Sequence, residues 1–415
     1  MGVRTKSEGY MPRIGGKASM ATVVAALLAL SACGSTGSGN SGGGGGVPTG
    51  SAAAPKGGGG ASFDTAACNS TTGVTPGFSN GVATVPGAAK SLSGAGSTFA
   101  APAYSVWTKA YASTGNQVAY QSIGSGGGVA QIQAQTVDFG DSDTPMSDAE
   151  MKAAKGGPIL HVPLLVGSVV PAYHLPGIGS GLKFTGDVLG KIYAGAITKW
   201  NDPELTKLNP GVKLPEEPIA VAHRSDGSGT TGIWTTYLTK ESPTWVSKLG
   251  GKATSEGKTV AWPVGIGGKG NEGVSGVVNQ TEGALGYLEL QYALAQNTTF
   301  GQVQNADKSA FVQPCLSTDT AAANQAHFPA DLRGDLTDEP GKDSYPITGT
   351  TYALVYQNQT NKAKAAALVN FFSWVLTKGQ DLNHEVNYSP LGAPLQKLAM
   401  AQLKKITVSG TPVAG

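Results

Sequence analysis

The pattern of hydrophobic and polar positions changes at about Ser91. Before it, one apolar stretch at residues 18–32 precedes a long run of small and polar residues. After it, short apolar runs alternate with segments in which apolar residues recur every three or four positions. This alternation is typical of α/β structure. Because 415 residues exceed the length of an ordinary single domain, we expect two lobes.

Helices are expected where apolar residues share one helical face. Tyr104, Trp107 and Tyr111 are spaced i, i+3 and i+7, and Pro102 suits the first turn of that helix. We interpret this stripe as core packing. Four further helical segments are expected: one that starts at residues 129–135, one capped by Ser147 and Glu150, one that carries Ile233, Trp234, Tyr237 and Leu238, and one at residues 365–376.

Strands are expected between these helices. Residues 117–122 and 219–222 have strand-like patterns, and the long apolar stretch at residues 159–174 fits one or two central strands. The sequence contains no internal repeat. The region after Ser91 is therefore expected to form α/β structure that is not built from repeated units.

The first 32 residues have the anatomy of a secretory signal peptide, with a basic start, an apolar middle and small residues before a cut point. The apolar stretch has 15 residues, whereas a membrane-spanning helix needs about 20. A buried core helix is the alternative, but such a helix rarely follows a basic leader. Residues 30–33, Leu-Ser-Ala-Cys, also resemble a bacterial lipobox, which implies that Cys33 carries lipid after cleavage.

Residues 33–62 are expected to comprise the lipidated cysteine and a flexible tether. Residues 34–60 hold 13 glycines in 27 positions and offer too little apolar surface to fold. A coil of that length spans about 30 Å root-mean-square, enough to hold a folded body off a membrane. Residues 63–90 have little pattern and are expected to form a loosely structured arm.

Two cysteines remain once Cys33 is assigned to lipid. In an oxidising compartment, Cys68 and Cys315 are expected to pair and tie the early segment to the folded body. Two separate buried thiols are the alternative. Together these features predict an extracytoplasmic protein held at the outer face of the cell membrane by a lipid anchor only.

The formal net charge of +2 comes from the first 32 residues, which carry four basic side chains and one acidic side chain. The remainder holds 25 basic and 26 acidic residues. A body so close to neutrality argues against nucleic acid as a partner, because nucleic-acid binders carry a concentrated basic face.

Three short segments share one design, in which a strand ends, small and hydroxyl residues follow, and a helix begins. They are residues 94–99 (Gly-Ala-Gly-Ser-Thr-Phe), 123–128 (Ile-Gly-Ser-Gly-Gly-Gly) and 224–230 (Arg-Ser-Asp-Gly-Ser-Gly-Thr). Each would present backbone N–H groups and a hydroxyl at the positive end of a helix dipole, which favours anions. Arg224 adds a planar fork suited to tetrahedral oxyanions. Any one segment alone fits a tight turn, but three in one chain predict an anion site.

The three segments resemble those of the substrate-binding proteins of bacterial phosphate ABC transporters, and the resemblance extends over residues 91–400. It implies an α/β, two-lobed periplasmic-binding-protein-like fold of type II, with a hinge and a phosphate-holding cleft between the lobes. The implied first lobe comprises residues 91–168 with 347–415, and the second comprises residues 169–346. Further stretches that carry the resemblance are residues 137–143 (Val-Asp-Phe-Gly-Asp-Ser-Asp), 197–202 (Ile-Thr-Lys-Trp-Asn-Asp), 264–270 (Val-Gly-Ile-Gly-Gly-Lys-Gly) and 345–347 (Tyr-Pro-Ile).

In the first lobe, the resemblance implies phosphate contacts from Thr98, from the backbone amide of Phe99, and from the hydroxyl and amide of Ser125. It also implies a contact from Asp143. A carboxylate beside an anion is repulsive unless the anion donates a proton, which phosphate species at neutral pH do and sulfate does not. On sequence alone a turn-forming role for Asp143 is the simpler interpretation. The match to the family motif favours a phosphate contact instead.

In the second lobe, the resemblance implies that Arg224 pairs with phosphate while Asp226 orients the arginine. Ser228, Gly229 and Thr230 would close around the anion at the start of a helix. The implied partners are therefore inorganic phosphate and the permease subunits of an ABC transporter with their ATPase, and we expect a monomer.

Two positions depart from the family pattern. His223 stands where relatives often carry another basic residue, so the charge beside Arg224 can depend on pH. Gly126 replaces a serine common in relatives and could remove one hydroxyl from its turn. Neither change removes an expected phosphate contact.

An enzymatic function has little support in the sequence. A phosphoester hydrolase, the main alternative, needs an activated nucleophile with a base or metals, and no such cluster lies near Ser125 or Ser228. The spacing Gly265, Gly267 and Gly270 satisfies G-x-G-x-x-G but lacks the context of a dinucleotide site. The five histidines have no metal-ligand spacing. We expect no enzyme activity, cofactor or metal; a surface phosphate sensor without transport is the other alternative.

Overall fold

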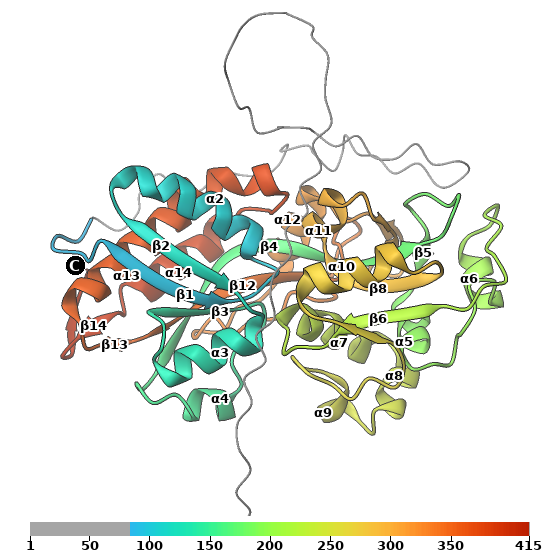
Figure 1. Cartoon of the computed structure of the whole chain (residues 1–415), viewed down its shortest axis with the longest axis horizontal. Helices are drawn as coiled ribbons and strands as arrows, with labels where there is room; N and C mark the ends of the chain where they lie inside the picture. Colours follow the sequence, from blue (N-terminus) through green and yellow to red (C-terminus); the bar gives the residue numbers. More distant parts are fainter. Residues whose placement is uncertain (1–83, 415) are drawn as a thin grey trace, which may run out of the picture. The chain divides into compact units, whose positions relative to one another are not determined.

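The computed structural model of the chain describes residues 84–414, which form two α/β lobes joined by a long strand that runs through both (Figure 1). The main sheet has the strand order β2-β1-β3-β12-β4-β8-β6-β7, with β9 paired to β4. Its strands are β1 (Ser91–Gly96), β2 (Gln117–Ser122), β3 (Phe139–Ser142), β4 (Ile159–His174), β6 (Ala220–Arg224), β7 (Ile266–Gly268), β8 (Ala284–Glu289), β9 (Thr299–Phe300) and β12 (Thr348–Tyr356).

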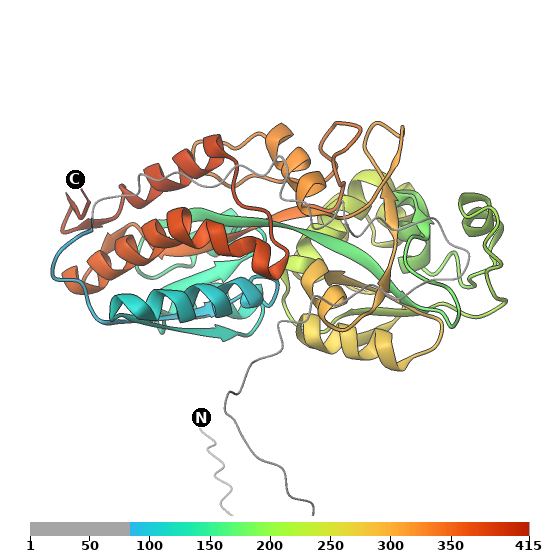
Figure 2. The same cartoon turned by 90° about the horizontal axis from the view of Figure 1, so that it is seen from above.

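In the first lobe, helices cover both faces of the β2-β1-β3-β12 part of the sheet. Helices α2 and α13 lie side by side on one face (Figure 2), where the ring centroids of Tyr111 and Phe371 are 5.1 Å apart. Helix α3 packs on β1 and β3. The helices of this lobe are α2 (Ala101–Tyr111), α3 (Ser125–Ala134), α4 (Asp148–Lys152), α13 (Lys362–Trp374) and α14 (Ala393–Leu403).

The second lobe is built around β8, β6 and β7, with an aromatic cluster beneath β6. The rings of Trp234 and Tyr287 stack with centroids 5.2 Å apart, and Tyr193 packs against both. Its helices are α5 (Gly186–Tyr193), α6 (Pro203–Leu208), α7 (Gly229–Glu241), α8 (Pro243–Lys248), α9 (Lys252–Ser255), α10 (Gly270–Gln280) and α11 (Leu290–Ala295). Helix α12 (Leu316–Gln325) packs on β4 and β12.

Smaller elements complete the described residues. After α13 come a π-helical segment (Val375–Gly379) and a 3-10 segment (Gln380–Val386), and another 3-10 turn (Ala112–Thr114) follows α2. Two small sheets have the orders β11-β10-β5 and β13-β14-β15. Their strands are β5 (Lys183–Phe184), β10 (Gln302–Gln304), β11 (Phe311–Val312), β13 (Asn358–Gln359), β14 (Thr407–Val408) and β15 (Thr411–Pro412).

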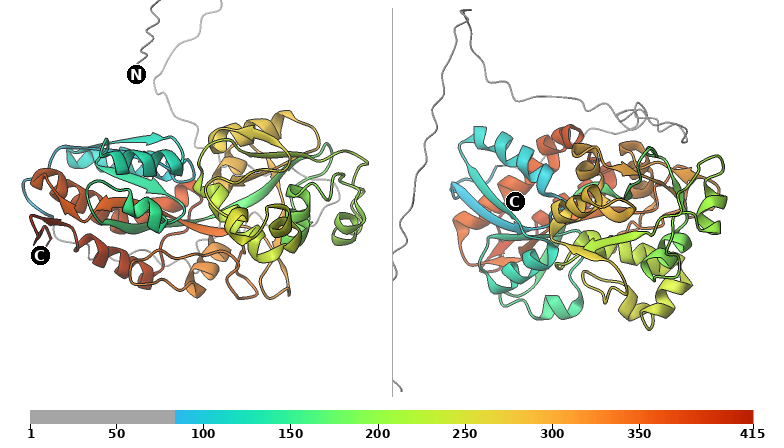
Figure 3. Two further views of the ribbon diagram at one scale, coloured as in Figure 1. Left: turned by 90° about the horizontal axis from the view of Figure 1, so that it is seen from below. Right: turned by 45° about the vertical axis from the view of Figure 1, so that its right-hand side comes forward.

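Strand β4 passes from one lobe to the other, as the views of Figures 1 and 2 and both views of Figure 3 show. Residues 159–168 pair with β12, whereas residues 169–174 pair with β8. The change of partner falls between Ser168 and Val169, where the Val169 N–H donates to the Ile347 carbonyl at 2.8 Å. The buried Asp319 carboxyl accepts hydrogen bonds from the hydroxyls of both Ser168 and Thr348. One side chain thus links the two strands where they cross between the lobes.

Most of the expected elements are present. The stripe of Tyr104, Trp107 and Tyr111 is the buried face of α2, with proline in its first turn. The apolar stretch at residues 159–174 is one continuous strand, buried at every position but the last. Ser147 and Glu150 form the predicted capping box at the start of α4.

Two boundaries were wrong. Helix α3 begins at Ser125 rather than Val129, because the glycines that follow Ser125 are part of its first turn, and α13 begins at Lys362. At Gly128, an added Cβ would lie 2.5 Å from the Asp141 carbonyl oxygen, so this glycine lets α3 approach β3 closely. The expected strand at 219–222 extends over Ala220–Arg224, which brings Arg224 to its end.

The predictions for residues 1–83 lie outside the described residues. They include the signal peptide, lipidation of Cys33, the tether and most of the arm. Residues 84–90 carry no helix or strand, yet Val85 exchanges two hydrogen bonds with the side chain of Asn370 in α13. Cys315, before α12, is disulfide-bonded; Cys68 lies outside the described residues, so their pairing stays a prediction. Within residues 84–414, no helix is long and apolar enough to cross a bilayer.

Candidate functional site

The first of the three predicted turns follows β1. Thr98 is 4% exposed, and its hydroxyl accepts hydrogen bonds from the side-chain amide of Asn271 at 2.9 Å and from the Asn271 backbone at 3.3 Å. Phe99 is fully buried, with its ring 5.9 Å from that of Tyr388. Because Asn271 lies in the first turn of α10, this turn of the first lobe is bound directly to the second lobe.

The second turn follows β2 and leads into α3. Gly124 precedes the helix with φ +85°, a conformation that favours glycine. Ser125 is 1% exposed; its hydroxyl donates to Asp143 Oδ2 at 3.3 Å and accepts from the Asp143 N–H at 3.2 Å. The neighbouring Gly126 N–H donates to the Gly227 carbonyl at 2.8 Å across the two lobes. An added Cβ at Gly126 would lie 3.0 Å from Gly227 Cα, so a side chain here would crowd that contact.

The third turn joins β6 to α7 and carries the arginine. The Arg224 guanidinium donates in a two-pronged arrangement to Asp226, with Nε to Oδ1 at 2.8 Å and Nη2 to Oδ2 at 2.6 Å. Nη1 lies 3.4 Å from the hydroxyl of Thr230. The Arg224 N–H donates to the Tyr287 hydroxyl at 3.0 Å, so the aromatic cluster holds the base of this residue. Ser228 caps α7 by accepting from the Thr231 N–H at 3.1 Å.

The second and third turns meet at Gly229, the first residue of α7. An added Cβ there would lie 2.6 Å from Asp143 Oδ2 and 2.6 Å from Ser125 Oγ. Likewise, an added Cβ at Gly124 would lie 2.3 Å from Asp226 Oδ2 and 3.4 Å from Arg224 Nη2. The structure thus brings the predicted polar residues of both lobes together in one buried place.

The pKa values of the two carboxyl groups at this site are shifted in opposite directions. Burial raises the pKa of Asp143 to about 6, although hydrogen bonds from Ser97, Thr351 and Ser125 and the charge of Arg224 oppose the rise. Burial also acts on Asp226, but the guanidinium of Arg224 outweighs it and lowers the pKa of that carboxyl. Arg224 is therefore paired with a firmly ionised Asp226, whereas the pKa of Asp143 is raised to about 6.

Two polar residues of the site, Asn271 and Thr351, were missed by sequence reasoning. Asn271 bridges the hydroxyls of Thr98 and Thr230, at 2.9 and 3.3 Å, and its carbonyl accepts from the Glu289 N–H. Thr351 on β12 contacts both Asp141 and Asp143. The sequence offered two indications of these contacts: Gly270, which immediately precedes Asn271, and Asp141, which lies within residues 137–143.

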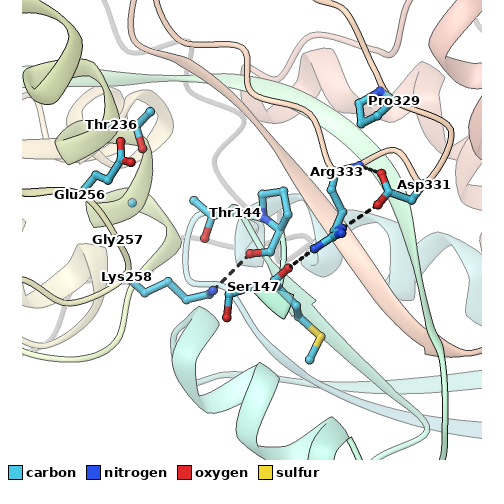
Figure 4. A pocket seen from close by; sticks show the side chains of 12 residues that line it. Thr144, Ser147, Thr236, Glu256, Gly257, Lys258, Pro329, Asp331 and Arg333 are labelled. Carbon is cyan, nitrogen blue, oxygen red and sulfur yellow. Dashed lines mark hydrogen bonds and ion pairs between the residues drawn. The ribbon is translucent and has the colours of Figure 1, made fainter. Parts of the chain in front are cut away.

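A separate cavity of about 570 Å³ opens beside the site, between the loop after Asp143 and the segment around Lys258 (Figure 4). The ammonium of Lys258 donates to the Pro145 carbonyl at 3.3 Å, and the guanidinium of Arg333 donates to the Met146 carbonyl at 3.1 Å. Lys258 also pairs with Glu150 at 2.9 Å, and Arg333 pairs with Asp148 and Asp331. Both cations of this cavity are therefore paired with carboxylates, as Arg224 is with Asp226.

His223, which precedes Arg224, points away from the anion site. Its ring stacks on Trp262 with centroids 4.9 Å apart, and its Nδ1 lies 3.0 Å from the Arg224 carbonyl oxygen. Contact with Trp262 therefore explains the residue at this position better than contact with a ligand.

Residues 81–378 of the chain match the family model of the PBP superfamily domain. The phosphate-binding protein PstS of Xylella fastidiosa (strain 9a5c) is 41% identical over 338 residues, covering 79% of this chain and 90% of that protein. The phosphate-binding protein PstS of Pasteurella multocida (strain Pm70) is 42% identical over 320 residues, covering 76% and 90%.

A solved structure agrees on the fold. The high affinity periplasmic phosphate-binding protein PfluDING, bound with phosphate, superposes with a TM-score of 0.61 at 19% identity, covering 75% of this chain and 93% of that chain. At this identity the likeness concerns the fold alone. The superfamily match and the two relatives, which extend over most of the chain, show that it belongs to the PBP superfamily and, within it, to the PstS family of phosphate-binding proteins.

Proposed function

We propose that this protein is an extracytoplasmic solute-binding protein that captures inorganic phosphate between its lobes and delivers it to an ABC importer. The observation that carries the proposal is that Arg224 and Asp143 are both buried and lie close enough to interact electrostatically, near the start of α7. A cation provides the attraction for an oxyanion, while a carboxylate nearby admits only an anion that donates a proton. Inorganic phosphate has both properties at neutral pH.

The proposed contacts divide between the lobes. From the first lobe, Thr98 and Ser125 donate hydroxyl protons, Phe99 donates its backbone N–H, and Asp143 accepts the proton of the ligand. From the second lobe, Arg224 pairs with the anion, with Asp226 fixing its guanidinium, and the start of α7 at Ser228, Gly229 and Thr230 supplies backbone N–H groups and hydroxyls.

Capture by lobe closure follows from contacts shared between lobes, since a ligand that touches both lobes favours the closed state. We place the hinge where β4 and β12 cross, with residues 91–168 and 347–415 as the first lobe and residues 169–346 as the second. The change of strand partner at Ser168 and Val169 supports this division. Delivery would then depend on the permease recognising the closed form, and lipid on Cys33 would hold the protein at the membrane.

Thermal unfolding with different oxyanions tests the proposed ligand. At one hundred times its dissociation constant, a ligand that binds only the folded state adds about 2.7 kcal/mol, which corresponds to a Tm rise of about 5 °C. We expect this rise with phosphate, a comparable rise with arsenate, and less than about 1 °C with sulfate, because sulfate has no proton for Asp143. Equal stabilisation by sulfate would disprove the role given to Asp143.

The ion pair of Lys258 with Glu150 is expected to stabilise the closed state. It joins the second lobe to α4 of the first, with the two side chains 14% and 30% exposed. Lys258→Met keeps the apolar stem but loses the charge, so we expect phosphate affinity to fall about fivefold, mainly through faster dissociation. Stopped-flow release and isothermal titration calorimetry measure both quantities.

The control for Lys258→Met is Lys199→Met, which removes an exposed ion pair with Glu216 within the second lobe. That pair has side chains 51% and 71% exposed, and its loss is expected to leave phosphate affinity unchanged. An equal loss in both variants would show that general charge, rather than the contact between lobes, is responsible.

A further inference from the structure

The hydroxyl of Thr351 lies between two buried carboxyl groups. Its Oγ1 is 2.6 Å from Asp141 Oδ1 and 2.9 Å from Asp143 Oδ1. A threonine hydroxyl has one proton, so it can donate a full hydrogen bond to only one of these oxygens. Sharing that proton between two buried carboxylates would leave both poorly satisfied, whereas a protonated carboxyl can donate to the threonine oxygen. The geometry therefore favours a neutral carboxylic acid at one of the two aspartates.

The surroundings of the two carboxyls identify which one is neutral. Asp141 is fully buried, and its Oδ2 accepts from the Tyr104 hydroxyl at 2.8 Å. The groups that face it are Tyr104 from α2, Tyr120 from β2, Thr351 from β12 and Asp143 on its own strand, all of them neutral or acidic. Burial and the charge of Asp143 raise the pKa of Asp141 well above its usual range.

Asp143 has the more favourable surroundings for a charge. Hydrogen bonds from Ser97, Ser125 and Thr351 stabilise its ionised form, and it also faces the positive charge of Arg224. Between two coupled carboxyls, the proton stays on the one that lacks a cation.

We propose that Asp141 is a neutral carboxylic acid that directs the Thr351 proton onto Asp143 and so keeps Asp143 an ionised acceptor for the ligand. The chain of donors runs from Tyr104 to Asp141 Oδ2, from Asp141 Oδ1–H to Thr351, and from Thr351 to Asp143 Oδ1. Asp143 Oδ2 then faces Ser125 and the start of α7. Asp141 is a positioning residue that acts through Thr351, and its role in selection rests on the proposed phosphate binding.

The protonation of Asp141 predicts an unusual dependence of stability on pH. A carboxyl that stays protonated in the folded protein but ionises in the unfolded chain lowers stability as the pH rises from its unfolded pKa to its folded pKa. Asn matches the neutral acid in shape, with its oxygen toward Tyr104 and its NH₂ toward Thr351. We expect Asp141→Asn without ligand to melt about 3 °C or more above the wild type at pH 8, with the difference shrinking toward pH 4.

The control for this experiment is Asp138→Asn, on the same segment. Asp138 is ion-paired with Lys364 at 2.8 Å, so its replacement is expected to lower the Tm at pH 8. If Asp141→Asn also melts below the wild type at pH 8, Asp141 is ionised and the proposal fails. Infrared spectroscopy of the wild type gives a second measurement: the carbonyl band of a protonated carboxyl at pH 8 must shift in Thr351→Val.

Measured affinities for phosphate and sulfate distinguish a positioning role of Asp141 and Thr351 from a role in folding alone. Asp141→Asn is expected to keep the ratio of phosphate to sulfate affinity within about threefold of the wild type, as a neutral mimic should. Thr351→Val deprives Asp143 of a donor and is expected to lower that ratio at least about tenfold at pH 7. A ratio unchanged in Thr351→Val would overturn the role in selection.

The two proposals can fail separately. If the wild type binds no phosphate while Asp141→Asn is stabilised at pH 8, the neutral Asp141 stands and the phosphate function fails. If phosphate binds but the stabilisation is absent, the phosphate function stands and the inference about Asp141 fails.

Discussion

Replacing Arg224 by alanine is expected to lower the affinity for phosphate about a thousandfold, the largest loss among single substitutions at the site. The side chain is 1% exposed and is held by Asp226, so its removal takes away the buried cation and leaves Asp226 without its partner. Removing one member of a buried, hydrogen-bonded charge pair costs about 4 kcal/mol, which corresponds to that factor. Isothermal titration calorimetry with phosphate measures the change.

Two further variants control for charge and for folding. Arg224→Lys keeps a positive charge but loses the planar fork, and we expect an affinity between those of the wild type and Arg224→Ala. Arg333→Ala removes an arginine from the neighbouring cavity, where it joins the second lobe to the Met146 carbonyl and Asp148 of the first, and we expect phosphate affinity to fall no more than about fivefold. Similar losses in Arg224→Ala and Arg333→Ala would contradict a specific role for Arg224.

Replacing Asp143 by asparagine is expected to abolish the discrimination between phosphate and sulfate. The wild-type carboxylate would face an oxygen lone pair of sulfate, whereas an amide can donate to either anion. Two pH units above its pKa, about one Asp143 carboxyl in a hundred is protonated and able to donate to sulfate, so we expect Asp143→Asn to lower the ratio of phosphate to sulfate affinity about a hundredfold at pH 8. Its loss of phosphate affinity should be smaller than that of Arg224→Ala; the reverse order would contradict the assigned roles.

The pH dependence of sulfate binding provides a check on the same residue. The pKa of Asp143, raised by burial to about 6, means that the carboxyl gains a proton as the pH falls through 6. The neutral acid can donate to sulfate, so sulfate affinity in the wild type should rise between pH 8 and pH 5. In Asp143→Asn that rise should be absent, while Asp138→Asn should retain it. A rise of equal size in Asp143→Asn would assign the titration to another group.

The local parts of the site could be predicted from the sequence. Arg224, Asp226 and Ser228 lie within five residues of one another, so their relative placement follows from one strand end and one helix start. The long apolar run was likewise sufficient for β4, which is buried at every position but the last, and the helical spacing of Tyr104, Trp107 and Tyr111 was sufficient for α2.

The parts of the site that depend on distant chain segments could not be predicted. Thr351 reaches Asp143 across 208 positions, and Asn271 reaches Thr98 across 173. A threonine in a fully buried apolar strand has no local pattern that distinguishes it from packing. The start of α3 was misplaced for a different reason. Glycine propensity opposes a helix at residues 126–128, but the close approach of Gly128 to Asp141 in β3 requires glycine at that position.

The link from Asp319 to Ser168 and Thr348 has a mechanical consequence. Because one carboxyl joins both crossing strands, closure about the proposed hinge would turn these strands together, and the lobes would move like two arms on a common pivot. A small rotation at the pivot displaces the outer ends of the arms far more than the crossing itself. A membrane partner that touches both outer ends could therefore tell a loaded protein from an unloaded one at a distance, without touching the ion.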